Sequence, residues 1–203
     1  RPGDVGPGGQ RQVADRRYEM VKVVILCGGK GSRLRPVTDL IPKGLVTLRG
    51  QPLLQHLVES YIGKGFRNFL LCIGYRGDMI VDYFKRHPVD AKLEYSDAGD
   101  SASMLQRLHH AKEMMTDRVF VAYGDTLINV DLDAMLADHL SSGALATITT
   151  ANVRSPFGLV TFDQDRWIDS FEEKALQPYF VGHMLVERTL LDGLARDLLD
   201  LPD

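Results

Sequence analysis

Hydrophobic and polar positions along the chain follow two different periods. Short runs of β-branched and aliphatic residues end in glycine, as VKVVILC does before Gly28-Gly29, which is typical of a buried strand. Between such runs, apolar residues recur every three or four positions, which predicts helices with one buried face. The predicted strands are 21–27, 69–73, 91–95, 119–123 and 145–151, and the predicted helices are 52–64, 78–84, 103–115 and 131–142.

This alternation of strands and helices predicts an α/β, Rossmann-like fold: a mostly parallel mixed sheet flanked by helices. After residue 151 the pattern changes to the short pieces 157–162, 167–172 and 180–186, which favour a small antiparallel part. We expect Trp167 to pack within that part and a final helix to cover 188–201. Residues 1–19 are rich in Pro and Gly at their start, so we expect a flexible leader before one domain, 20–203, divided into 20–151 and 152–203.

Composition narrows the function classes. Of 203 residues, 44% are hydrophobic and 25% are charged, the mix of an ordinary globular protein. The formal net charge of −3 argues against a nucleic-acid partner, because such affinity comes mostly from basic surface. The apolar runs are too short to span a membrane. Two cysteines argue against a disulfide framework, which favours the cytoplasm.

The loop after the first predicted strand, GGKGSRLRP at 28–36, combines three glycines with three cationic side chains. Ligands of parallel sheets bind at the carboxyl ends of the strands, so this loop suits a polyphosphate; a glycine turn with solvated basic residues is the alternative. It is not a Walker A loop, because Gly-Lys-Ser/Thr is missing at the required spacing. It also fits the dinucleotide fingerprint poorly, since Leu34 stands where the third glycine belongs.

The stretch ILCGGKGSRLRPVT, followed by Pro42-Lys43 and then GQPLL, resembles the signature of the sugar-phosphate nucleotidyltransferases, or NDP-sugar pyrophosphorylases. The resemblance continues in order through CIGYRG, YGDTLINVD, FG and FEEK, and covers about residues 20–191. CIGYRGDMIVDYF and DAGDSASMLQRL are most similar to cytidylyltransferases that act on glucose 1-phosphate. Guanylyl-, thymidylyl- and uridylyltransferases share much of the pattern.

The resemblance implies an enzyme that joins an NTP, with CTP favoured, to a sugar 1-phosphate and releases pyrophosphate, with Mg²⁺ as cofactor. The sugar-phosphate oxygen would attack the α-phosphorus in line, so catalysis is positioning and charge neutralisation. By the resemblance, Arg33 contacts the leaving phosphates, Lys43 contacts the α-phosphate, and Asp125 binds the metal. The other implied contacts are Leu26, Gly28, Gly29, Gly31, Ser32 and Arg107 for the nucleotide, and Gly158, Glu173 and Lys174 for the sugar phosphate.

Four of these residues have an alternative interpretation: Arg33, Lys43 and Arg107 could be ordinary solvated side chains, and Asp125 could be a helix or turn cap. Three departures from the family pattern also matter. Leu105-Gln106 replaces a glycine pair near the base, and Phe180 stands where an Asn contacts the sugar, which predicts a smaller or less hydroxylated acceptor. The family's second metal carboxylate has no match in the sequence. Three interpretations fit this: a shortened enzyme, a metal held by Asp125 together with water and substrate oxygens, or weakened catalysis.

Two other function classes are alternatives to this enzyme. A nucleotide-binding regulatory protein would keep the fold without turnover, and a dehydrogenase would bind NAD(P)H on a similar sheet. Retention of Arg33, Lys43, Asp125 and Lys174 favours the enzyme. We also expect a homo-oligomer, because members of the family often form dimers or tetramers.

Overall fold

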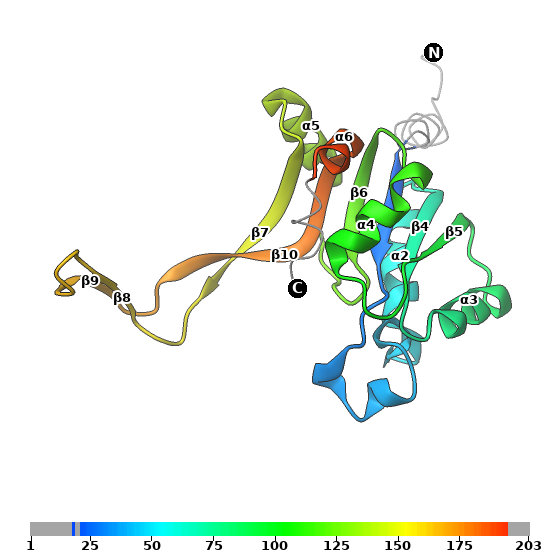
Figure 1. Ribbon diagram of the computed structural model, residues 1–203, viewed down its shortest axis with the longest axis horizontal. Helices are drawn as coiled ribbons and strands as arrows, with labels where there is room; N and C mark the ends of the chain where they lie inside the picture. The colour runs from blue at the N-terminus through cyan, green and yellow to red at the C-terminus, as the bar shows by residue number, and fades with distance from the viewer. Residues whose placement is uncertain (1–17, 19–20, 195–203) are drawn as a thin grey trace, which may run out of the picture.

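The computed structural model describes Tyr18 and residues 21–194 of the chain (Figure 1). A six-stranded sheet lies at its centre in the order β5-β4-β1-β6-β10-β7. The first four strands in that order are parallel, and β10 runs antiparallel to both of its neighbours. The strands of this sheet are β1 (Lys22–Leu26), β4 (Asn68–Ile73), β5 (Lys92–Asp97), β6 (Arg118–Tyr123), β7 (Ala146–Arg154) and β10 (Leu176–Glu187).

Helices cover both faces of the sheet, because the alternating side chains of the central strands form two separate apolar clusters. One cluster packs α2 (Leu53–Gly63), α3 (Gly77–Arg86) and α5 (Leu132–Ser142) around the fully buried Phe66 and Phe69. The other packs α4 (Met104–Ala111) and α6 (Arg188–Asp192) against Val24 and Val121. The predicted α/β architecture with a mostly parallel sheet is therefore confirmed. No helix of the described residues is long and apolar enough to cross a bilayer.

The sequence pattern placed most elements correctly but missed some ends. The helix predicted over 78–84 is longer, since α3 spans Gly77–Arg86, and its N-cap residue is Arg76 in a left-handed conformation. The strand predicted over 180–186 is longer, since β10 pairs with β7 along most of its length. The final helix is described only over Arg188–Asp192, and the prediction for 195–201 lies outside the described residues.

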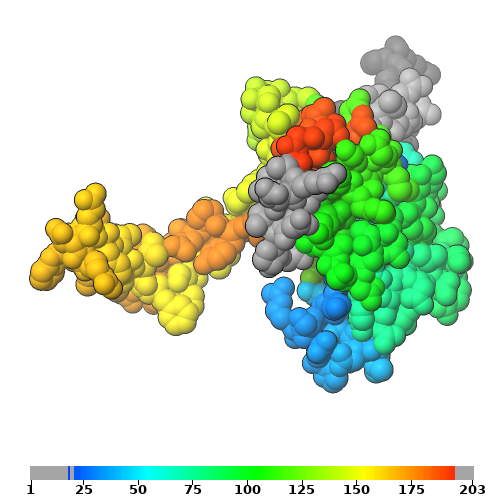
Figure 2. All heavy atoms as spheres, in the orientation of Figure 1, coloured from blue at the N-terminus to red at the C-terminus, as the bar shows by residue number. Residues whose placement is uncertain are grey.

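Strands β7 and β10 extend past the body of the molecule as a two-stranded arm that ends in the small hairpin β8 (Leu159–Phe162) and β9 (Ile168–Glu172) (Figure 1). Figure 2 shows this arm, residues 151–180, standing clear of the body. Its large apolar side chains are exposed, Trp167 at 74% and Phe157 at 76%. The expectation that Trp167 packs within the antiparallel part is wrong, because a two-stranded hairpin has no second layer to cover it.

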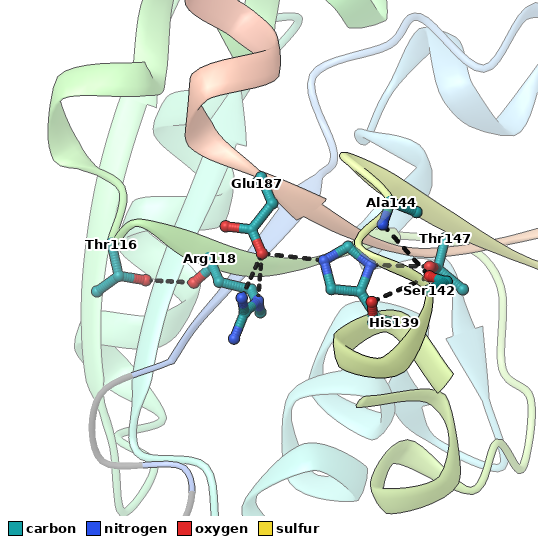
Figure 3. Close-up of polar contacts among 7 residues, drawn as sticks. All are labelled: Thr116, Arg118, His139, Ser142, Ala144, Thr147 and Glu187. Atoms are coloured by element: carbon teal, nitrogen blue, oxygen red, sulfur yellow. Dashed lines mark hydrogen bonds and ion pairs between the residues drawn. The ribbon is translucent and has the colours of Figure 1, made fainter. Parts of the chain in front are cut away.

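A polar cluster around the buried His139 connects the base of the arm to the body (Figure 3). His139 of α5 is 1% exposed and lies within hydrogen-bond distance of the Thr147 hydroxyl on β7 (2.8 Å) and the Glu187 carboxylate on β10 (3.0 Å). Arg118 of β6 forms an ion pair with the same carboxylate. These contacts join α5 and β6 to the two strands that continue into the arm.

The predicted leader, residues 1–19, lies outside the described residues except for Tyr18. That side chain is 4% exposed and stacks on Phe66, with ring centroids 4.2 Å apart. Its hydroxyl donates a hydrogen bond to Asp133 at the start of α5. The packed core therefore includes a residue that the composition assigned to the leader.

Candidate active site

A cavity of about 300 Å³ lies where the carboxyl ends of β1 and β6 meet the start of α4. This is the edge at which open α/β sheets bind their ligands. Its lining comes from the glycine-rich loop, the Pro42-Lys43 segment, the start of α4 and the end of β6. The residues are Leu26, Cys27, Gly28, Gly29, Gly31, Arg33, Lys43, Gly44, Ala102, Met104, Arg107, Tyr123, Gly124 and Asp125.

The glycine-rich loop leaves β1 and turns back over the cavity. Gly31 has a φ of 61°, and a Cβ there would lie 3.0 Å from both Lys43 and Thr38, so both the backbone angle and the space require glycine. The Thr38 hydroxyl donates to the carbonyl oxygen of Gly31 (3.0 Å) and holds the turn. The loop then forms a short 3₁₀ helix, Ser32–Leu34, on which Arg33 is exposed at the cavity edge.

Lys43 and Asp125 both line the cavity and form an ion pair there. Their side chains are about one-quarter exposed, at 26% and 27%. Asp125 is the second residue after β6, and the hydroxyl of the neighbouring Thr126 donates a hydrogen bond to its carboxylate at 3.4 Å. The structure thus brings a cation and a carboxylate from positions 82 residues apart to one point.

Arg107 lies under the floor of the cavity and is 3% exposed. Its guanidinium donates to the carbonyl oxygens of Ile73 (2.7 Å) and Asp100 (3.5 Å). The guanidinium fits there because Gly28 and Gly74 have no side chains. A Cβ on either residue would collide with it. Within the described part of the chain its hydrogen-bond partners are these carbonyl oxygens, and no carboxylate forms an ion pair with it.

The two cysteines beside this guanidinium are buried and free. Burial raises the pKa of the Cys72 thiol to about 12, and the nearby Arg107 charge offsets only part of that effect. Burial also raises the pKa of Cys27, strongly. Both thiols therefore stay protonated near neutral pH, which excludes them as thiolate nucleophiles in this state.

The structure does not bring every sequence-predicted site residue together. Ser32 is exposed on the loop and is absent from the described cavity lining. Gly158, Glu173 and Lys174 lie on the arm, apart from the cavity (Figure 1). Gly158 is required locally, because a Cβ there would meet the ring of Phe171 at 2.5 Å, and Lys174 occupies a tight turn with a φ of 54°.

The sequence patterns also left out residues that the structure places in the cavity, among them Ala102, Met104 and Tyr123. Tyr123 could have been found from its position at the carboxyl end of a predicted strand, directly before Gly124-Asp125. A larger hollow of about 430 Å³ lies near Lys64 and Asp131. None of the sequence-predicted site residues lines it, so we assign the site to the smaller cavity.

We expect Gly74→Ala to weaken nucleotide binding by about tenfold. The added Cβ would lie 2.8 Å from the carbonyl oxygen of Gly99 and would displace the Arg107 guanidinium, and such overpacking costs about 1–3 kcal/mol. Isothermal titration with an NTP measures the effect. Gly63→Ala on α2 is the matched control, because no atom lies within 4 Å of its added Cβ. Equal affinity in both variants would contradict the arrangement around Arg107.

Together, a glycine-rich loop, cavity-facing cations and one carboxylate near the end of a parallel strand give this cavity the chemistry that suits a polyphosphate. The sequence model of the nucleotidyl transferase family matches residues 22–183, and the chain belongs to that family. It is a nucleotidyltransferase, and the expected family is thereby confirmed.

Known relatives agree with this assignment. A protein of Bacillus subtilis (strain 168) described as a probable glucose-1-phosphate cytidylyltransferase is 31% identical, over 87% of this chain and 79% of its own length. A UTP–glucose-1-phosphate uridylyltransferase of Synechocystis sp. (strain PCC 6803) is 30% identical over 76% of this chain, which spans 44% of that longer protein. The crystal structure of HddC from Yersinia pseudotuberculosis aligns with a TM-score of 0.71 and 25% identity, over 87% of this chain and 81% of its own.

Proposed function

We propose that this protein transfers a cytidylyl group from CTP to a sugar 1-phosphate or a related phosphate, releasing pyrophosphate. The observation that carries the proposal is the pairing of Lys43 with Asp125 inside the cavity that the glycine-rich loop encloses. Both side chains keep about a quarter of their surface open. An incoming triphosphate can therefore reach the ammonium and the carboxylate without disturbing the core.

Each part of the site has a distinct role in this proposal. The backbone of Gly28 and Gly29 leaves room for the nucleotide, and Leu26 contacts its ribose or base. The ammonium of Lys43 exchanges its carboxylate partner for an α-phosphate oxygen, so charge that builds up at phosphorus meets a fixed cation. The exposed Arg33 neutralises the leaving β- and γ-phosphates. No protein nucleophile is needed, because the acceptor phosphate attacks directly.

The site also fits the Mg²⁺ that we propose as cofactor. Mg²⁺ is usually held by one or two carboxylates together with substrate phosphate oxygens, and Asp125 supplies one such carboxylate at the cavity wall. Among the described residues there is no group of three or more His, Cys, Asp or Glu side chains that could hold a metal ion. When bound, the ion would neutralise phosphate charge. The free, buried thiols favour action in the reducing cytoplasm.

The choice of CTP is supported by the sequence likeness to cytidylyltransferases, while the Synechocystis relative uses UTP by its name. A competition assay tests it: equal concentrations of CTP, UTP, GTP and dTTP with one acceptor, and the nucleotide sugars separated by chromatography. We expect CDP-sugar as the main product. A different main product would overturn the base assignment and leave the transferase intact.

We further propose that the protein works as a homo-oligomer in which the arm of one copy reaches the cavity of another. Two observations support this. Glu173 and Lys174 lie on the arm, apart from the cavity of their own chain, and the apolar side chains of the arm are exposed. A two-stranded ribbon with such a surface needs a covering partner to be stable.

A mixing experiment tests the shared site. Lys43→Ala and Lys174→Ala are each expected to be nearly inactive. Mixed oligomers of the two co-expressed variants should regain turnover, because the cavity of the Lys174→Ala chain keeps Lys43 and receives Lys174 from the arm of the Lys43→Ala chain. Activity that stays at the level of the single variants would show that each chain uses its own arm. Light scattering on Leu176→Asp, with Leu140→Asp on α5 as an equally exposed control (54% and 56%), tests whether the arm forms the contact.

A further inference from the structure

The stretch that continues the glycine-rich loop, residues 32–40, is fixed at one buried residue. Thr38 is 1% exposed, whereas every other residue of 32–40 is exposed. The Thr38 hydroxyl donates to the carbonyl oxygen of Gly31 at 3.0 Å. Arg33 lies on this otherwise exposed stretch, at the edge of the cavity. The position of Arg33 therefore depends on the contacts that hold Thr38 and its neighbours.

Two residues that follow β4 supply such contacts. The Tyr75 hydroxyl donates to the carbonyl oxygen of Thr38 (3.1 Å), and the Tyr75 backbone N–H donates to the carbonyl oxygen of Gly28 (3.0 Å). The Arg76 guanidinium donates to the carbonyl oxygen of Asp39 (2.7 Å) and to the Tyr75 hydroxyl (3.1 Å). Tyr75 and Arg76 thus bind the loop near its start and at its far end.

The backbone of Arg76 is strained. Its φ of 52° and ψ of 35° lie in the left-handed region, which is unfavourable for a residue that has a Cβ. Such strain persists only where the surrounding contacts hold it, and it occurs preferentially at functional sites. A glycine would adopt this conformation without strain, but it could not donate to Asp39. The arginine therefore keeps a contact to the loop at a cost in backbone strain.

We infer that Tyr75 and Arg76 are positioning residues, which hold the glycine-rich loop over the cavity so that Arg33 meets the nucleotide phosphates at a fixed place. The inference deepens the proposed function and rests on it. Neither side chain is among the described residues that line the cavity, so both act through the loop. A loop that is already ordered loses less conformational entropy when a ligand binds. A cation held in place also stabilises the leaving phosphates without rearrangement.

The first test removes one hydroxyl. Tyr75→Phe keeps the ring and loses the hydrogen bonds to Thr38 and Arg76, so kcat/KM for CTP should fall by about tenfold, with the KM of the acceptor nearly unchanged. Hydrogen exchange without nucleotide should become faster in the amides of residues 31–39. Tyr83→Phe is the matched control, because Tyr83 is a half-buried tyrosine of α3 whose hydroxyl donates to Gln55 instead of the loop.

A second variant separates positioning from stability. Arg76→Gly relieves the backbone strain and removes the guanidinium, so the melting temperature should stay the same or rise. Its kcat/KM for CTP should nevertheless fall, and its loop amides should exchange faster. If Arg76 served stability alone, kcat/KM would follow the melting temperature. Arg76→Lys should recover part of the loss, because it keeps a donor for the carbonyl oxygen of Asp39.

The outcomes distinguish this inference from the proposed function. Equal loop exchange in Tyr75→Phe and Tyr83→Phe would overturn the inference. Faster exchange with unchanged kcat/KM for CTP would also overturn it, while the transferase activity stands. If the native protein binds CTP and releases no pyrophosphate with any acceptor, the proposed function fails. Loop exchange and CTP affinity by titration would then still decide whether the two residues hold the loop for the nucleotide.

Discussion

Replacing Asp125 by asparagine is expected to lower kcat by about 10²- to 10³-fold, the usual size of a lost electrostatic group in a preorganised site. The carboxylate lies at the end of β6, lines the cavity and pairs with Lys43. Asparagine keeps the shape and the Thr126 contact but removes the charge that would hold a metal. The Mg²⁺ concentration needed for half-maximal turnover should rise in the same variant.

Steady-state rates over a Mg²⁺ series measure both effects, and circular dichroism checks that the fold is kept. Asp138→Asn is the control, because Asp138 is an exposed residue of α5 away from the cavity. Turnover of Asp125→Asn within threefold of the native protein, at the native Mg²⁺ requirement, would remove Asp125 from the catalytic site.

The second large effect is expected for Lys43→Ala, which should also lower kcat by about 10²-fold or more. The ammonium is a compact cation held at the cavity wall by Asp125, and alanine leaves that carboxylate unopposed beside an incoming triphosphate. The half-maximal Mg²⁺ concentration should change much less than in Asp125→Asn. Lys43→Arg should restore little, because a planar guanidinium does not reproduce the position of an ammonium.

Lys85→Ala is the control for this variant, since Lys85 is an exposed lysine of α3 that pairs only weakly with Asp82 at 3.4 Å. The double variant Lys43→Ala/Asp125→Asn should lose less than the two single losses combined, because the residues contact each other. Full additivity would mean that the two side chains act independently, contrary to the geometry.

Much of this fold can be predicted from local patterns in the sequence. The buried strands are continuous apolar runs, and α4 begins where Ser103 and Gln106 form a capping box. Asp131 likewise caps α5 by accepting from the Ala134 amide (3.0 Å). The cavity residues from the glycine-rich loop to Asp125 could be predicted because they come after the carboxyl ends of parallel strands, which meet at one edge of the sheet.

The position of the arm does not follow from such local patterns. Its strands alternate like those of an ordinary small sheet, yet Trp167 and Phe157 lie exposed, because nothing in the local pattern says which surface will cover them. The burial of Arg107 could not be predicted from local patterns either, because it depends on Gly28 and Gly74, two residues far from it in sequence. Glu173 and Lys174 fit their motif in sequence, while the structure sets them apart from the cavity of their own chain.

Pyrophosphate release by the purified chain tests directly whether this cavity catalyses nucleotidyl transfer. The assay offers CTP with a panel of hydroxylated and deoxy sugar 1-phosphates, with and without Mg²⁺, and uses Asp125→Asn as the negative control. We expect Mg²⁺-dependent release that requires both CTP and an acceptor and falls by about 10²-fold or more in the variant. No release above that of the variant with any acceptor, while CTP binds, would contradict the claim that this cavity catalyses nucleotidyl transfer.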